Sequence, residues 1–243
     1  MELGRYAKQH RHVLSSELPP LLEEVAVRGT ICDLGCGDGA ILFALHSRGL
    51  LSNAYAVDLA PGHVRAAEAV SPAVSGVVGD AVASGLADRC ADGVIVSQVI
   101  EHLPDDRPLA AEISRLLRPG GWWYVGSVIK GRRAWWIYKV EGVRRLDPTH
   151  IREYSAAVDL EAVLAVPGLH RTSTRVTPLR FPLTDLVART LIRAGWMSPD
   201  RMMSLYTRSR WLTLARQLRL RVPGYYLVEV AGVAPSIEEL RPT

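Results

Sequence analysis

The sequence predicts an α/β protein whose strands form a doubly wound parallel sheet with helices on both faces. Short apolar runs, each ending in a polar residue, recur four times between residues 31 and 98. Stretches with helical spacing of apolar residues separate them, and a glycine-rich turn follows the first run. A helix at 109–117 and a fifth strand at 122–128 come next. Strands that alternate with helices in this way are typical of a parallel sheet.

The first run and the turn after it, ICDLGCGDG at residues 31–39, are the most informative stretch. Three glycines follow Asp33 at alternate positions, namely Gly35, Gly37 and Gly39. Glycine permits turn angles that other residues resist, and it leaves room for a ligand against the main chain. An amphipathic stretch at 40–45 comes next. We therefore expect a strand, a tight turn and a helix, with backbone N–H groups facing a nucleotide-like cofactor.

This turn alone leaves the cofactor open. The dinucleotide pattern is G-x-G-x-x-G, but the third glycine of this chain falls one position early, at Gly39. Asp33 would repel a pyrophosphate, whereas its carboxylate could hold an ammonium group. NAD, FAD, phosphates and S-adenosylmethionine all use turns of this kind, and a purely structural turn is a further alternative.

The three later runs end in Asp58, Asp80 and Gln98. Asp58 lies 19 positions after Gly39, and an acid at about this distance suits hydrogen bonds to ribose hydroxyls. Asp80 could accept a hydrogen bond from an adenine amino group. Because the carboxyl ends of parallel strands meet at one edge of a sheet, we expect these residues and Asp33 to line one crevice.

Five motifs occur in a familiar order: DLGCGDG at 33–39, VD at 57–58, GDA at 79–81, VIEHLPD at 99–105 and LLRPGGWW at 116–123. The succession resembles the class I S-adenosylmethionine-dependent methyltransferases, above all the small-molecule group (methyltransferase type 11-like) that includes ubiquinone-type and sugar methyltransferases. The resemblance covers about residues 28–176, and a weaker similarity extends over 225–233. It implies a Rossmann-like sheet of seven strands with an antiparallel hairpin at one edge. It also implies S-adenosylmethionine as cofactor and methyl transfer from its sulfonium to a nucleophile.

The resemblance places the cofactor on the glycine loop and on the ends of the next three strands. The residues expected to bind it are Asp33, Gly35, Cys36, Gly37, Asp58, Leu59, Asp80, Ala81, Gln98 and Val99. Cys36 is expected there only as a small residue that fits. The three cysteines of the chain have neither metal-ligand nor disulfide spacing.

Two histidines are the expected catalytic residues, because a hydroxyl or acidic carbon nucleophile needs a base with a pKa near neutrality. His102 belongs to a Glu-His pair that starts a helix beside the crevice in the family. His150 lies in a segment at 147–155 that resembles the family's D-P-x-H-x-x-x-Y/F motif at the acceptor pocket. The alternative for His102 is a structural hydrogen bond at the start of a helix.

The acceptor is expected to contact segments outside the strands. The residues proposed for it are Tyr6, His10, Arg132, Trp135, Trp136 and Tyr154. The first two lie in a stretch at 6–22 that reads as a helix. The basic and aromatic loop at 130–145 suits a flat, anionic or glycosidic acceptor, although it also suits an exposed loop. Some ubiquinone-type relatives hold a divalent cation with acids near the Glu-His pair, but no spacing here forces a site, and we expect no metal ligands.

A basic stretch lies between the last two expected strands, at 169–177 and 225–230. Nine arginines accompany two aspartates between residues 177 and 222, a balance of +7 against +4 for the whole chain. Helical spacing at 183–192 and 210–220 predicts a helical insertion, since a structureless loop of this length is improbable. It could be a solvated basic face, a lid over a hydrophobic or anionic acceptor, or an attachment to an anionic membrane surface. Nucleic acid is disfavoured, because the arginines interleave with core-like apolar residues.

The chain of 243 residues, 48% of them hydrophobic, is long enough for one sizeable core. We expect a single methyltransferase domain over 1–243, made of an N-terminal helical lid, a cofactor-binding core, the helical insertion and a last strand (1–27, 28–177, 178–223 and 224–234). The N-terminus is polar and basic, and no apolar run is long enough to span a bilayer. A cytoplasmic location is therefore expected, with peripheral membrane contact as an open alternative.

The expected function is methylation of an oxygen on a small, hydrophobic or lipid- or sugar-like acceptor. Methylation of nitrogen or carbon, on a metabolite or a protein side chain, is the alternative. The sequence SQVI at 97–100 stands where amino-group and adenine methyltransferases carry an asparagine-containing tetrapeptide, which disfavours those substrates. A non-catalytic partner subunit is an alternative of another class, and the intact cofactor residues argue against it.

Overall fold

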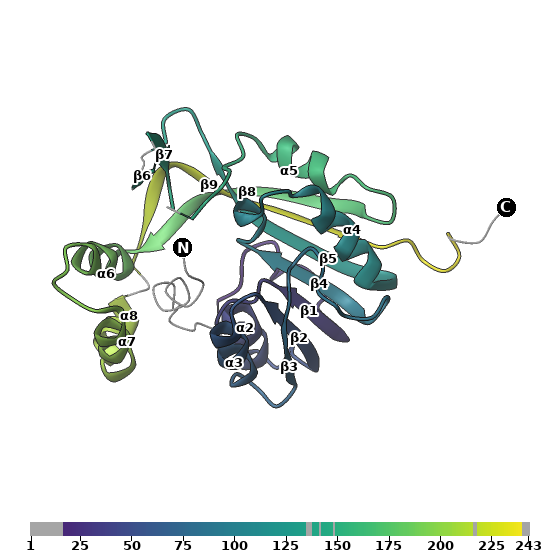
Figure 1. The fold of residues 1–243 in the computed structure, drawn as a ribbon, viewed down its shortest axis with the longest axis horizontal. Coiled ribbons are helices and arrows are strands. Elements are labelled where there is room, and N and C mark those ends of the chain that lie inside the picture. Colours follow the sequence, from purple (N-terminus) through teal and green to yellow (C-terminus); the bar gives the residue numbers. More distant parts are fainter. Residues whose placement is uncertain (1–16, 135–137, 141, 148, 216–217, 240–243) are drawn as a thin grey trace.

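The computed structural model describes residues 17–134, 138–140, 142–147, 149–215 and 218–239. A seven-stranded sheet in the order β3-β2-β1-β4-β5-β9-β8 forms its centre (Figure 1). The strands are β1 (Thr30–Leu34), β2 (Asn53–Asp58), β3 (Val74–Val78), β4 (Ala91–Ser97), β5 (Leu117–Lys130), β8 (His170–Pro182) and β9 (Arg219–Val233). The first five pair in parallel, whereas β9 is antiparallel to both β5 and β8. This arrangement confirms the predicted α/β fold with an antiparallel edge hairpin.

Helices pack on both faces of the sheet. The elements are α2 (Ala40–Ser47), α3 (Pro61–Glu68), the 3-10 helix η1 (Ile100–His102), α4 (Arg107–Leu116) and α5 (Ala157–Leu164). Because side chains alternate along a strand, Val94 and Val96 of β4 join the core under α4 and α5, while Ile95 joins the core under α2 and α3. Both faces of the sheet are therefore apolar, as a parallel sheet between two helical layers requires.

Two glycines allow the tight backbone conformation of the first loop. Gly39 precedes α2 with a φ of 83°, and a Cβ atom there would lie 2.8 Å from Ala67 Cα. Gly35 has a φ of 72°, and a Cβ atom there would lie 2.3 Å from a methyl group of Val99. Both positions combine a left-handed backbone with a close approach, so only glycine fits without a shift of the neighbouring segment.

The insertion between β8 and β9 is helical, as the sequence predicted. It contains α6 (Leu183–Arg193), α7 (Pro199–Arg208) and α8 (Arg210–Ala215), which lie together beside the extended ends of β8 and β9 (Figure 1). The helix predicted at 210–220 is too long, because Arg219 and Leu220 pair with Pro182 and Phe181 across the sheet. Strand pairing therefore overrides the helical period of that stretch.

Helix α7 is absent from the predictions, although its start carries a recognisable signal. Ser198 accepts a hydrogen bond from the Arg201 N–H at 3.2 Å, and Pro199 is the first helical residue. A small antiparallel pair, β6 (Tyr138–Val140) and β7 (Val143–Arg145), also forms within the predicted loop at 130–145.

The N-terminal helix predicted at 6–22 is not seen in its described part. Residues 17–22 form an irregular stretch that enters a turn. Pro19 and Pro20 lie there, and proline both lacks an N–H donor and restricts the residue before it. Residues 6–16 lie outside the described part of the chain. Among the described helices, none has the length and apolar character needed to cross a bilayer.

Candidate functional site

The glycine loop after β1 folds back onto the end of β2. The N–H groups of Gly35 and Cys36 donate to the Val57 carbonyl at 2.7 and 2.9 Å, and the Gly37 N–H donates to Asp58 Oδ2 at 3.0 Å. Burial and the nearby aspartates raise the pKa of the Cys36 thiol far above its ordinary value. The thiol therefore stays protonated, in keeping with a small residue that fits the loop.

Asp58 at the end of β2 is an ionised carboxylate that organises this corner. Besides Gly37, it accepts a hydrogen bond from the Ala60 N–H at 2.8 Å and lies 3.2 Å from His63 Nδ1. Burial alone would raise the pKa of Asp58, but the bonds from His63, Ala60 and Gly37 outweigh burial and lower it. A charged acceptor is thus held at the strand end, where the sequence predicted contact with a ribose.

Asp33 at the end of β1 differs from Asp58, because its pKa is raised and not lowered. Its side chain is only 2% exposed, and its Oδ2 atom has no hydrogen-bond partner among the described residues. Burial, followed by the negative charge of Asp58, raises the pKa of Asp33 to about 7. A buried acceptor without a partner is costly. A cationic group placed beside it would remove that cost.

The remaining predicted cofactor residues lie at the ends of β3 and β4. Asp80 follows β3 and accepts a hydrogen bond from the Val82 N–H at 3.1 Å. Gln98 follows β4 with a φ of 58°, unusual for a residue other than glycine, and its N–H donates to the Gly126 carbonyl at 2.8 Å. Strained backbone of this kind gathers at functional sites. Leu59 is half exposed and Ala81 is buried in the core.

The strand order β3-β2-β1-β4 brings these residues to one edge of the sheet. Asp80, Asp58, Asp33 and Gln98 follow one another along it at the carboxyl ends of adjacent strands. Ligands of open parallel sheets bind at this edge. Four segments that are distant in the sequence therefore meet at one crevice.

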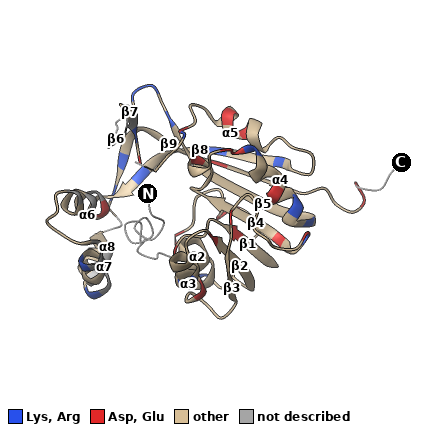
Figure 2. Ribbon diagram, in the orientation of Figure 1, with Lys and Arg blue, Asp and Glu red and all other residues tan. Residues whose placement is uncertain are grey.

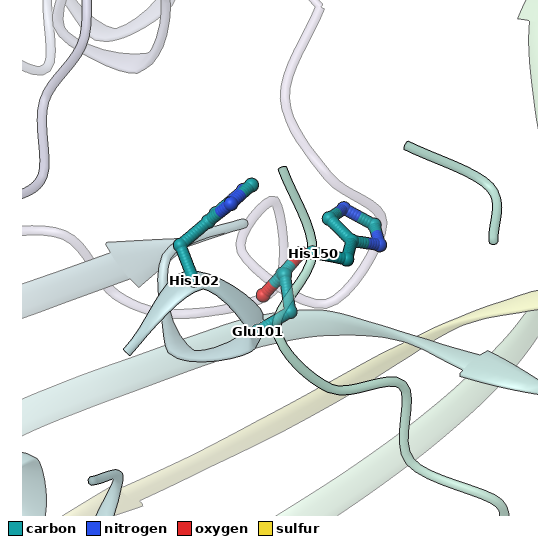
Figure 3. A group of neighbouring side chains, drawn as sticks. All are labelled: Glu101, His102 and His150. Atoms are coloured by element: carbon teal, nitrogen blue, oxygen red, sulfur yellow. The ribbon is translucent and has the colours of Figure 1, made fainter. Parts of the chain in front are cut away.

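The two predicted catalytic histidines are neighbours (Figure 3). His102 ends η1 and His150 lies in the loop before α5. Their ring centroids are 5.0 Å apart, and the rings meet edge to face at 72°. His150 is buried, whereas His102 is more exposed. Residues 48 positions apart in the sequence thus form one imidazole pair.

Thr149 determines which nitrogen of neutral His102 carries the hydrogen. The carbonyl and hydroxyl oxygens of Thr149 both lie 3.2 Å from His102 Nδ1. The Thr149 hydroxyl hydrogen is already donated to Asp147 Oδ1 at 2.6 Å. Both oxygens can therefore only accept from the ring. Nδ1 of His102 is the donor, and its lone pair lies on Nε2.

Glu101 completes a compact group with the two histidines (Figure 3). Its Oε2 atom accepts from the Ser127 hydroxyl at 2.9 Å, while its buried Oε1 atom has no partner among the described residues. Burial raises the pKa of Glu101, and the charge of His150 opposes that effect. Glu101, His102 and His150 each offer a ligand atom within 4.8 Å of the others, a donor set that could hold a divalent cation. The sequence did not predict this cluster.

Two other acids near the Glu-His pair, Asp105 and Asp106, have partners elsewhere in the fold. Asp105 accepts from the Arg107 N–H at the start of α4. Asp106 forms an ion pair with Arg152 and accepts from the Tyr154 hydroxyl at 2.7 Å. The ring of Tyr154 belongs to the core, so this residue, predicted to touch the acceptor, is instead bonded within the fold.

The other predicted acceptor residues are placed only in part. Arg132 is exposed just after β5. Tyr6, His10, Trp135 and Trp136 lie outside the described residues. Sequence reasoning missed His63, which supports Asp58, and Glu153, which lies 3.4 Å from His150 Nδ1. An acid three positions after a candidate histidine is the signal that could have revealed Glu153.

Comparison with known proteins agrees with this geometry. A family model described as a methyltransferase domain matches residues 32–125, which contain the glycine loop and the strand ends. A ubiquinone biosynthesis O-methyltransferase of Xylella fastidiosa (strain 9a5c) is 30% identical over 151 residues, which are 58% of this chain and 60% of the relative. A relative of the same name from Xanthomonas axonopodis pv. citri (strain 306) is 29% identical over 167 residues, 62% of this chain and 69% of the relative. The chain thus spans three fifths of the length of the first relative.

A solved structure of similar fold comes from Bacillus halodurans C-125 and is described as a methyltransferase. It has a TM-score of 0.60 and 15% identity, and the match covers 89% of this chain and 97% of that one. At such identity the likeness concerns the fold alone. Residues 32–125 thus match a methyltransferase domain, and the sheet order and the acids at the strand ends resemble those of the class I S-adenosylmethionine-dependent methyltransferases.

Proposed function

We propose that this protein transfers a methyl group from S-adenosylmethionine to a hydroxyl oxygen of a small acceptor. The observation that carries the proposal is the pair of acids at the ends of β1 and β2. Asp33 is buried, with no partner for Oδ2 in the part of the chain that the structure describes, and Asp58 beside it is held ionised. This combination suits a ligand that brings both an ammonium group and ribose hydroxyls.

The residues present fit that cofactor. Asp33 would bind its ammonium group, Asp58 its ribose hydroxyls and Asp80 its adenine amino group. Gln98 and Val99, with the glycine loop, would enclose the methyl-bearing centre. When bound, S-adenosylmethionine supplies a methyl group already activated by its sulfonium. The protein must then align the acceptor with that methyl group, exclude water and remove one proton.

His150 is the proposed base. Glu153 Oε1 lies 3.4 Å from His150 Nδ1, and Glu101 has a carboxylate oxygen within 4.8 Å of a ring nitrogen of His150. His150 would take the hydroxyl proton on Nε2, so that the acceptor oxygen could receive the methyl group that a bound S-adenosylmethionine would supply. His102, whose ring meets that of His150 edge to face, would help to shape the acceptor pocket.

The cluster could also hold a divalent cation on Glu101, His102 and His150. A bound cation would lower the pKa of a hydroxyl that coordinates it. Dialysis against a chelator distinguishes the two arrangements. Activity that is lost and then restored by added metal would assign the cluster to a cation, whereas unchanged activity would leave proton removal to His150.

The acceptor is proposed to be small and hydrophobic, or lipid- or sugar-like. The relatives from Xylella and Xanthomonas carry the name ubiquinone biosynthesis O-methyltransferase, which supports transfer to oxygen. Methylation of nitrogen or carbon is the alternative, and mass spectrometry of the product distinguishes them.

The helical insertion is proposed to contact an anionic membrane surface. Trp196 and Trp211 are 78% and 82% exposed, and Leu214 and Leu218 are also exposed. Arginines accompany them, and Lys and Arg residues gather where β8 and β9 extend toward the insertion (Figure 2). Exposed tryptophan beside arginine suits the interface of a bilayer that contains acidic lipids. A lipid-like acceptor would then be taken from that surface.

Titration calorimetry with S-adenosylmethionine, followed by transfer of a labelled methyl group, tests the central proposal. We expect one binding site per chain, and labelled product from hydroxylated aromatic or lipid-like acceptors. A His150→Ala variant should retain cofactor binding and lose about 10²–10⁴-fold in kcat, the usual contribution of a general base. Absence of binding at cofactor concentrations up to about 1 mM, corresponding to less than ~4 kcal/mol, would refute the proposal.

A further inference from the structure

Glu153 lies directly beside His150 in a buried network. Its Oε1 atom is 3.4 Å from His150 Nδ1 and accepts a hydrogen bond from the Leu146 N–H at 2.6 Å. Its Oε2 atom accepts from the Tyr225 hydroxyl at 3.3 Å and lies 3.4 Å from Lys130 Nζ. The side chains of Glu153 and His150 are each only 6% exposed. The carboxylate is therefore fixed by β5, by β9 and by the loop that carries His150.

Glu153 is the hydrogen-bond acceptor in this network. The Leu146 N–H and the Tyr225 hydroxyl donate to its two oxygens, and Lys130 Nζ lies 3.4 Å from Oε2. A carboxylate accepts hydrogen bonds and donates none. The hydrogen between the two side chains must therefore belong to Nδ1 of His150, and the lone pair of the neutral ring lies on Nε2.

We propose that Glu153 is a positioning residue that binds the Nδ1 hydrogen of His150 and so directs Nε2 of that ring toward the acceptor. The inference rests on the proposed function, in which His150 Nε2 receives the hydroxyl proton. Without an acceptor at Nδ1, the hydrogen can move to Nε2 and the ring can turn, so the basic nitrogen is lost from the crevice. The contact of 3.4 Å is long for a hydrogen bond, as catalytic contacts often are before substrate binds.

The surroundings of His150 favour Glu153 for this role. Among the described residues, Glu101, His102 and Glu153 lie beside the ring, and Lys130 and Tyr225 contact Glu153. Glu101 belongs to the compact group with His102 and His150, whereas Glu153 contacts Nδ1. The same orientation would also serve a cation, because histidines that bind metals commonly donate their other N–H to a carboxylate.

The test is the Glu153→Gln variant of the full chain, which keeps the side-chain size and removes the charge. Nitrogen NMR of histidine-labelled protein, about two pH units above the ordinary histidine pKa of ~6.5, reports which ring nitrogen carries the hydrogen. We expect the Nδ1–H form for His150 in the wild type and a shift toward the Nε2–H form in the variant. We also expect kcat to fall about 10–100-fold, the usual effect of losing such a partner. The KM for the cofactor should not change.

Two variants provide controls. Glu229→Gln removes the charge of another buried glutamate, which binds the Leu21 N–H and the Tyr124 hydroxyl, and it should change neither the His150 tautomer nor kcat. Glu153→Asp keeps the carboxylate and should restore much of the lost kcat. If Glu153→Gln does not fold, the wild-type NMR spectrum carries the test, because an Nε2–H form of His150 in the wild type would overturn the assignment.

Two results would refute two different proposals. An unchanged His150 tautomer together with an unchanged kcat in Glu153→Gln would overturn the assignment and leave Glu153 a purely structural anchor. The NMR measurement needs no acceptor. A wild type that transfers no methyl group would therefore refute the proposed function while the tautomer of His150 still tests the role of Glu153.

Discussion

The carboxylates of Asp33 and Asp58 end adjacent parallel strands, and the charge of Asp58 adds to burial in raising the pKa of Asp33. The two acids therefore differ in protonation near neutrality. Asp58 is held ionised by His63, Ala60 and Gly37, whereas the pKa of Asp33 is about 7. One fixed negative charge thus sits beside a second acid that an arriving cation can ionise.

Cofactor affinity should depend on pH through Asp33. An ammonium group pairs with the ionised form, so binding below pH 7 must first remove a proton from Asp33. The dissociation constant should rise by up to about tenfold for each pH unit below 7, and it should level off above it. Calorimetry at pH values below and above 7 measures this dissociation constant. The Asp33→Asn variant should bind weakly with no such dependence, and a flat wild-type profile would contradict the assignment.

The stability of the free protein should follow the same group with the opposite sign. The pKa of Asp33 rises from its ordinary value of 3.8 in the unfolded chain to about 7 in the folded protein, because the side chain is buried beside Asp58. The folded state therefore holds a proton that the unfolded state has lost between these values. The stabilisation from this proton is complete below pH 3.8 and is lost as the pH rises through about 7. The free energies of unfolding of wild type and Asp33→Asn, measured by denaturant titration, should diverge between pH 5 and 8. Only the wild type has the carboxyl group that titrates in this range.

Asp58→Ala should weaken cofactor binding by about 1.5–3 kcal/mol, the usual contribution of a hydrogen bond to a charged group. The loss has two sources, because Asp58 would bind the ribose and already holds the Gly37 N–H. Asp92→Ala is the matched control. Asp92 accepts from the Thr30 N–H at the opposite ends of β1 and β4, so its loss should lower stability and spare affinity. Equal affinities for Asp58→Ala and wild type would refute the ribose assignment.

Alanine at Gly37 and at Gly39 should have different consequences. A Cβ atom at Gly39 would lie 2.8 Å from Ala67 Cα, so Gly39→Ala should lower the melting temperature strongly. A Cβ atom at Gly37 would meet nothing within 4 Å, so Gly37→Ala costs only the strain of its positive φ, about 1 kcal/mol. It should nevertheless weaken cofactor binding, because the new methyl group would occupy the cofactor's place. Thermal melts with and without S-adenosylmethionine separate these effects.

Replacing Trp196 and Trp211 by alanine should weaken binding to vesicles that contain acidic lipids. Each exposed tryptophan would lose about 1.5–3 kcal/mol of apolar burial in the lipid interface. Cofactor affinity should be unchanged, because neither tryptophan belongs to the glycine loop or to the strand ends that would bind the cofactor. Vesicle flotation with neutral lipids is the control. Equal binding of the variant and wild type, or binding to neither vesicle, would exclude this surface as a membrane contact.

Local chemistry made the cofactor half of the molecule predictable. Apolar runs that end in Asp33, Asp58 and Asp80 identify strands, and parallel strands must place their carboxyl ends at one edge. The end of the helical insertion was harder to predict, because the last helix expected there competes with strand pairing between Leu220 and Phe181. Its outcome depended on a partner about 40 positions away, which no local pattern contains.

The sequence by itself determined the α/β order, the glycine loop and the acids at the strand ends, because each follows from residues close together in the chain. Only the tertiary structure decided that His102 meets His150 at 5.0 Å, that Tyr154 binds Asp106 and that Glu153 lies 3.4 Å from Nδ1 of His150. It also decided that Asp33 Oδ2 finds no partner among the described residues, beside an ionised Asp58. The physical reason is that burial, protonation and side-chain contact depend on segments that fold together from distant parts of the chain.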